Sequence, residues 1–207
     1  MTWNAWHGPR LLVQGCCIAT LAVCLTGCST TMELPATSSN VSYQETPIQL
    51  TSGQTVPLVV VEQVRDSRAS QDAGTVAGGT FNAGESYKNY IHTRFENELG
   101  LAGARLSPSV SDAQSKSQSI RRVAVTIRQT NYGGASMFYR TVAATNLLVE
   151  VFDESGQRVF AQTYFGNVEK KPVVSTAKQS GELMSQAVNQ AISRAIQDRE
   201  LRSVLGY

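Results

Sequence analysis

The sequence offers few side chains that could act as a nucleophile or a general base. Its four cysteines all lie within the first 28 residues, and its two histidines are His7 and His92. Histidine is the usual general base because its pKa lies close to neutral pH. The pattern around His92 favours an ordinary residue on the surface of a helix, with a general base as the alternative. One histidine in the body of the chain, and no carboxylate cluster with ligand spacing, argue against a metal site.

Ser175 and Lys178 have the Ser-x-x-Lys spacing found in some hydrolases. The same residues open a predicted helix, where ordinary capping chemistry explains them. The glycines of residues 74–84 have neither the spacing nor the lysine of a nucleotide-binding loop. We therefore expect a protein that is not an enzyme and that holds no cofactor and no metal, with an envelope hydrolase as a less favoured alternative.

An apolar run from Leu11 to Leu25 ends in Leu25-Thr26-Gly27-Cys28. A membrane span needs about 20 apolar residues, so this run is too short for one. Arg10 precedes it without an acidic residue, as in the first part of a signal peptide. The four residues resemble the lipobox of bacterial lipoproteins. The resemblance implies a signal peptide over 1–27, a diacylglycerol on the thiol of Cys28, and a further acyl chain such as palmitate on its amine.

The expected lipid on Cys28 predicts how the protein meets the membrane. One acyl chain binds only reversibly, whereas two or three anchor a protein durably without any protein contact. In lipoproteins an Asp after the lipidated Cys retains the protein at the inner membrane, and here that position is Ser29. The resemblance therefore implies the periplasmic face of the outer membrane in a Gram-negative cell.

Composition and charge favour one small domain on a tether. Residues 28–56 are rich in Ser, Thr, Pro and Gln, which is typical of a flexible linker. Residues 57–207 have the length of a single domain. The whole chain has 18 Lys and Arg against 16 Asp and Glu, a balance that argues against nucleic-acid binding. Beyond Cys28 there is no cysteine for a disulfide, so packing must stabilise the domain.

The periodicity predicts two helices and about four strands. Residues 58–64 suit a buried strand, and Tyr87, Ile91, Phe95 and Leu99 share one face of a helix over about 84–99, with Asn82 and Glu85 as a capping pair. An irregular connector follows over 101–119, with a short extended piece at 104–106. Alternating residues predict strands around 123–128, 147–152 and 159–165, the last with alternation at Val159, Ala161, Thr163 and Phe165, and a turn at 153–156. Apolar pairs every four residues after Thr176 predict a long C-terminal helix.

The order β-α-β-β-β-α predicts an α+β two-layer sandwich. We expect a mainly antiparallel sheet of about four strands with both helices on one face and a more polar face opposite. The lipobox, the tether, the strand ending in Asp66-x-Arg68, and the hairpin followed by a long helix together resemble the YajG-like bacterial lipoproteins. That family has no established enzymatic activity.

Two places are candidates for contact with a partner. We expect Asp66 and Arg68 to form a solvated ion pair of roughly 0–1 kcal/mol, with fixing the loop or contacting a partner as the alternatives. The stretch 131–139 places Met and aromatic residues between two strands; these either begin the next strand and pack on the sheet or form a binding surface. Its candidate residues are Tyr132, Met137, Phe138 and Tyr139.

The sequence therefore predicts a lipid-anchored, non-enzymatic adaptor of the cell envelope. Its partner would be another envelope protein or a glycan, bound through the 131–139 stretch or an open sheet edge. A carrier of lipid or another small ligand is the alternative and would need an apolar cavity between helices and sheet.

Overall fold

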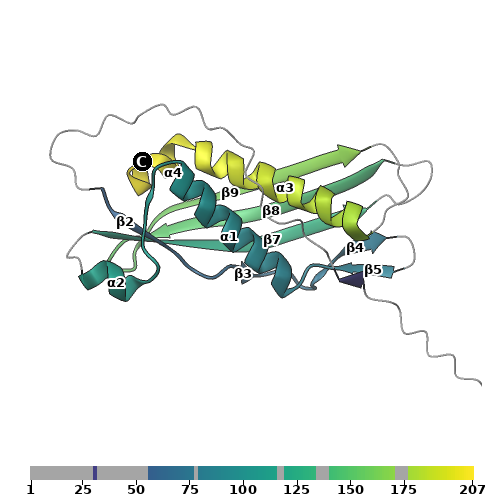
Figure 1. Ribbon diagram of the computed structural model, residues 1–207, viewed down its shortest axis with the longest axis horizontal. Helices are drawn as coiled ribbons and strands as arrows, with labels where there is room; N and C mark the ends of the chain where they lie inside the picture. The colour runs from purple at the N-terminus through teal and green to yellow at the C-terminus, as the bar shows by residue number, and fades with distance from the viewer. Residues whose placement is uncertain (1–29, 32–55, 77–78, 116–118, 134–139, 171–176) are drawn as a thin grey trace, which may run out of the picture.

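Three long antiparallel strands form the largest part of the sheet. The computed structural model describes residues 30–31, 56–76, 79–115, 119–133, 140–170 and 177–207 (Figure 1). β7 pairs with β8, and β8 pairs with β9, along nearly their whole lengths. These strands span Ile120–Gly133, Thr141–Phe152 and Arg158–Lys170. All three are longer than predicted, because polar residues such as Thr130 and Thr145 occupy buried positions and hide the apolar alternation.

Short strands extend the sheet on the other side of β7. β2 (Leu58–Val61) and β3 (Arg65–Asp66) pair with β7 in parallel, and β6 (Arg105–Leu106) pairs with β2 in parallel. β4 (Asp72–Val76) also meets β7, and it pairs antiparallel with β5 (Gly79–Asn82), which pairs with β1 (Thr30–Thr31). Within the described residues the sheet thus has nine strands and mixed pairing. The predicted number of about four was too low, since β1, β3 and β6 have only two residues each and β4 and β5 lie in a glycine-rich stretch without apolar alternation.

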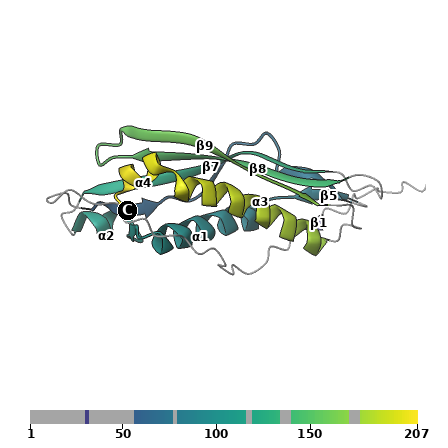
Figure 2. The same cartoon turned by 90° about the horizontal axis from the view of Figure 1, so that it is seen from above.

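Two long helices lie on the same face of the sheet (Figure 2). α1 spans Glu85–Leu101 and α3 spans Ala177–Gln197, and the two contact each other. The predicted capping pair is wrong, because Asn82 belongs to β5 and α1 begins after Gly84 without a side-chain cap. The position of Thr176, expected to cap α3, lies outside the described residues.

Two short helices complete the described part of the chain. α2 spans Val110–Ser115 in a segment predicted to be a connector, and Ser109 caps it by accepting a hydrogen bond from the backbone N–H of Asp112 at 3.1 Å. α4 spans Arg199–Leu205, and the carboxylate of Asp198 accepts from the N–H groups of Glu200 and Leu201. Both starts have the Ser or Asp that helix N-termini favour.

The main core lies between the sheet and the two long helices. The predicted face of α1 is confirmed, since Tyr87, Ile91, Phe95 and Leu99 are all fully buried. α3 contributes its apolar pairs, and it lies so close to β9 that a Cβ on Gly166 would overlap the carbonyl oxygen of Ala187. A smaller cluster on the other face of β2 joins Leu58 and Val60 to α2 and Ile120.

The helices described here give no sign of a membrane span, since none combines the length and the apolar character that crossing a bilayer requires. This finding concerns only the residues that the structure describes, which do not include the apolar run of residues 11–25.

Candidate binding groove

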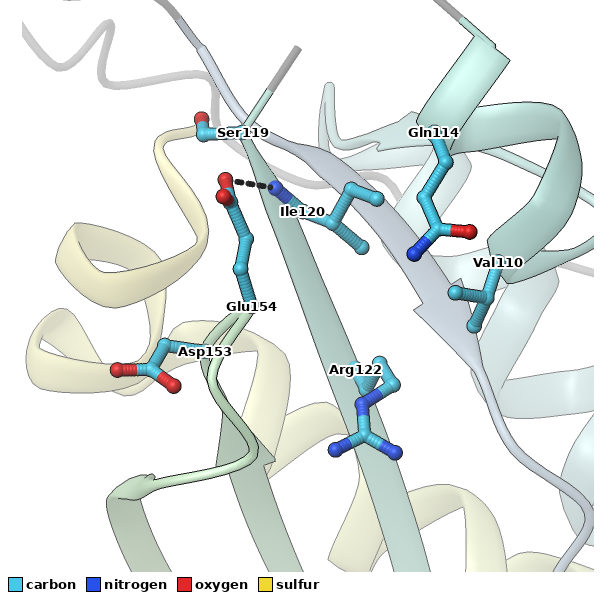
Figure 3. A pocket seen from close by; sticks show the side chains of 7 residues that line it. All are labelled: Val110, Gln114, Ser119, Ile120, Arg122, Asp153 and Glu154. Carbon is cyan, nitrogen blue, oxygen red and sulfur yellow. Dashed lines mark hydrogen bonds between the residues drawn. The ribbon is translucent and has the colours of Figure 1, made fainter. Parts of the chain in front are cut away.

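A groove of about 440 Å³ lies where α2, the start of β7 and the β8–β9 turn meet (Figure 3). Its volume falls within the range of about 300–1,000 Å³ that is usual for small-ligand sites. α2 supplies Val110 and Gln114, and the turn supplies Asp153 and Glu154. The beginning of β7 and the residue before it supply Ser119, Ile120 and Arg122.

One carboxylate of the groove holds its two walls together. Glu154 accepts a hydrogen bond at 3.0 Å from the backbone N–H of Ile120, as the dashed line in Figure 3 marks. This bond ties the β8–β9 turn to the first residue of β7. The same bond also satisfies the backbone N–H of Ile120 with a side-chain acceptor in place of a strand carbonyl.

The second carboxylate belongs to the turn. Asp153 accepts hydrogen bonds from the hydroxyl of Ser155 at 2.6 Å and from the backbone N–H of Gln157 at 2.9 Å. The bond from Ser155, chiefly, lowers the pKa of the Asp153 carboxyl below its ordinary value. Gly156 completes the turn with a φ of +83°, a conformation that glycine adopts without strain. The predicted turn at 153–156 is therefore confirmed.

Arg122 supplies the positive charge of the groove. Its guanidinium lies 3.4 Å from a carboxylate oxygen of Glu62 and 5.8 Å from the centre of the Phe152 ring. About a third of the side chain remains exposed. A guanidinium has five N–H donors, and the ion pair with Glu62 engages only part of them. Arg122 can therefore donate hydrogen bonds to a ligand in the groove.

The lining of the groove mixes charged, polar and apolar groups. It combines one guanidinium, two carboxylates, an amide and an apolar side provided by Val110 and Ile120. Its single hydroxyl, on Ser119, has no histidine, lysine or cysteine beside it among the lining residues. A serine nucleophile needs such a base within hydrogen-bond reach. Mixed charges with an apolar side fit a polar ligand or a protein segment.

Asp66 and Arg68 form an ion pair whose side chains are largely shielded from solvent, which corrects the expected solvated pair. Arg68 donates to both carboxylate oxygens of Asp66, at 2.9 and 2.6 Å, and to the carbonyl oxygen of Ala83. Its side chain is 5% exposed and lies over the ring of Tyr87. The pair therefore fixes the chain after β3 against the start of α1, as the loop-fixing alternative expected.

The 131–139 stretch is only partly described. Tyr132 lies in β7 and is 3% exposed, so its ring packs in the core and is no free anchor for a partner. Met137, Phe138 and Tyr139 lie outside the described residues, as does Cys28. Their proposed roles stay predictions.

Of the residues considered for catalysis, the structure describes His92 and Lys178. His92 is half-buried on α1, with its ring 3.4 Å from the carbonyl oxygen of Val61 and 3.9 Å from Glu96. Lys178 is exposed at the start of α3, and Ser175 lies outside the described residues. Neither His92 nor Lys178 lines the groove. In the described part of the chain, no group of three His, Cys, Asp or Glu residues could hold a metal ion.

The sequence alone did not indicate the groove, because its lining residues are far apart in the chain. Arg122 is in β7 and Glu154 is in the β8–β9 turn, about 30 residues later, and α2 was expected to be irregular. A usable signal was present at Ser109, whose spacing of three from Asp112 is that of a helix cap. It would have located one wall of the groove.

No family model and no curated protein matches the sequence. Among solved structures, the chain is similar to a minor lipoprotein from Acinetobacter baumannii, with 8% identity, a TM-score of 0.43, and coverage of 73% of this chain and 94% of that one. It is similar to the protein CT253 from Chlamydia trachomatis, with 12% identity, a TM-score of 0.43, and coverage of 74% and 98%. It is also similar to lipoprotein GNA1162 from Neisseria meningitidis, with 12% identity, a TM-score of 0.35, and coverage of 65% and 96%.

Proposed function

We propose that this protein is a lipid-anchored, non-enzymatic adaptor of the bacterial envelope that binds another envelope component in the groove between α2, β7 and the β8–β9 turn. The observation that carries the binding role is the groove itself, of about 440 Å³ and lined by charges of both signs. The Leu25–Cys28 pattern supports the anchor, and Ser29 supports the outer membrane as its location. The resemblance to YajG-like lipoproteins is part of this proposal.

A carrier function has less support. A lipid carrier needs an apolar cavity between helices and sheet. Large side chains fill that space in the described part of the chain, and they are less than 2% exposed: Tyr87, Phe95, Ile91, Leu99, Ile127, Leu147, Met184, Ile192 and Ile196. A lipid would have to displace several of them, at a cost of a few kcal/mol for each.

Photocrosslinking in intact envelopes tests the groove. A photoreactive amino acid replaces Gln114, which lines the groove, and in a control it replaces Thr93, which is exposed on α1. We expect a discrete crosslinked product from position 114 that weakens severalfold when Arg122→Ala is added, and no such product from position 93. Equal products from both positions, or a product unaffected by Arg122→Ala, would contradict the groove as the binding site.

A further inference from the structure

The face of the sheet opposite α1 and α3 carries an exposed aromatic ring among amides. In Figure 2 both long helices lie on one side of β8 and β9, and no described helix covers the other side there. Phe165 points to this open face and is 53% exposed. It is one of three large apolar residues that are exposed among the described residues. A large exposed ring on an open sheet face is available for contact with a ligand.

Four amide side chains surround Phe165 on the same face. Asn146 stands opposite Phe165 in the β8–β9 pairing, and Gln129 stands opposite Asn146 in the β7–β8 pairing. In the next row, Asn131 and Asn167 lie on either side of Ala144. We call these five side chains the amide patch: Gln129, Asn131, Asn146, Phe165 and Asn167.

The amide patch is uncharged, and ion pairs stand at both of its ends. Arg158 and Glu150 pair at 2.9 Å towards the β8–β9 turn, and Arg140 and Glu169 pair at 3.1 Å towards the opposite end. Between them the five side chains of the patch offer one aromatic surface, with donors and acceptors from each amide. An anionic ligand would find no cation within these five side chains.

The backbone beneath the ring is held in place by α3. The carbonyl oxygen of Phe165 accepts from the guanidinium of Arg194, and the N–H of Asn167 donates to the side-chain oxygen of Gln190 at 2.7 Å. These two groups face the free edge of β9 and are already bonded. A partner strand therefore cannot pair with β9 at this point, which makes the side chains of the open face the available contacts. A binding surface fixed before the ligand arrives loses little entropy on binding.

We propose that the amide patch binds a neutral saccharide, with the ring of Phe165 stacked on a pyranose face. A pyranose presents C–H groups on one face and hydroxyls around its rim, which match an aromatic ring and a set of amides respectively. Amides satisfy hydroxyls because both donate and accept hydrogen bonds. This inference rests on the proposed location in the bacterial envelope, which would supply the sugar. It adds a glycan as a second kind of partner, besides the component proposed to bind in the groove.

The test uses the full chain in detergent micelles and tetra-N-acetylchitotetraose as the probe, measured by calorimetric titration or by NMR. We expect Phe165→Ala to raise the Kd roughly tenfold, the equivalent of about 1.4 kcal/mol. Asn146→Ala should raise it severalfold. Val159→Ala is the matched control, because Val159 is also an exposed apolar residue of β9, at 41%, but lies outside the amide patch. The Kd of this control should stay within about twofold of the unaltered protein.

Two further experiments distinguish the two sources of the sugar, peptidoglycan and lipopolysaccharide. If the protein sediments with purified peptidoglycan and this depends on Phe165, the sugar comes from peptidoglycan. If it binds lipopolysaccharide micelles and this depends on Phe165, the sugar comes from lipopolysaccharide. No binding of the probe at about 10 mM, binding unchanged by Phe165→Ala, or a Phe165-dependent self-association instead would overturn the proposal. Arg122→Ala should leave the Kd for the sugar unchanged, so failure of either site can be told from failure of the other.

Discussion

The Asp66–Arg68 pair shows how burial changes the meaning of a short charge motif. The same two residues are worth little on a surface, because water already solvates both charges. Here the guanidinium is 5% exposed and the carboxylate side chain 14% exposed, so removing one partner leaves the other charge poorly solvated. The guanidinium also bonds the carbonyl oxygen of Ala83 just before α1. The pair therefore links β3 to the start of a helix.

We expect Asp66→Asn to lower the free energy of unfolding by about 3 kcal/mol at pH 7, the lower end for breaking a buried ion pair. Hydrogen bonding from Arg68, chiefly, lowers the pKa of the Asp66 carboxyl in the folded protein. The stabilisation is therefore complete above the unfolded pKa, about 3.9, and is lost as pH falls through the folded pKa. Urea unfolding at several pH values should show the gap between the two proteins narrowing below pH 4.

Glu62→Gln is the control for this prediction. Glu62 pairs at 2.6 Å with Arg65, whose side chain is 57% exposed, and we expect a loss of about 1 kcal/mol or less. If Asp66→Asn cost no more than Glu62→Gln at pH 7, the buried pair would not have the structural role assigned to it.

The packing of α3 on β9 decides which side of that strand meets solvent. The sequence suggested alternation at Val159, Ala161, Thr163 and Phe165, but Phe160 and Tyr164 occupy the core instead. The pairing shifts by one residue between Val151 and Phe152, where β9 accommodates an extra residue. A shift of one residue exchanges the two faces of a strand. Phe165 is exposed for this reason.

We expect Gly166→Ala to destabilise the protein by about 1–3 kcal/mol, the usual cost of overpacking. A methyl group at this position would overlap the backbone of α3 at Ala187, and backbone cannot move aside as a side chain can. Gly133→Ala is the matched control, because a Cβ on Gly133 of β7 would meet nothing within 4 Å. Urea midpoints should separate the two variants; equal midpoints would mean that α3 does not lie this close to β9.

At the scale of the whole molecule, the proposed anchor is the lipid on Cys28. The described helices include none that could span a membrane. We expect Cys28→Ala to move the protein from the membrane fraction to the soluble fraction while its circular dichroism stays native. Several acyl chains are needed for durable anchorage, and the variant would have none.

Ser29→Asp provides the comparison for the anchor. By the resemblance to lipoproteins it should keep the protein in the membrane fraction but shift it from the outer to the inner membrane on a density gradient. A Cys28→Ala protein that still sediments with membranes would refute the lipid as the anchor.

By itself, the sequence determined the features that depend on neighbouring residues. The faces of the two long helices, the hairpin turn at 153–156 and the lipobox pattern are all local, and the two long helices and the turn agree with the structure. It also indicated the two-layer arrangement, since one-sided strands and one-sided helices must cover each other.

Only the tertiary structure decided the features that join distant residues. β3 has two residues and exists because β7, about 60 residues later, pairs with it. The groove joins α2 to a turn some 40 residues on, and the amide patch joins three strands. Backbone pairing of this kind depends on which strands are neighbours, and periodicity within a strand carries no information about its neighbours. The same limit applied to the exposed face of β9, because a one-residue shift in pairing reverses a strand's faces without changing its sequence.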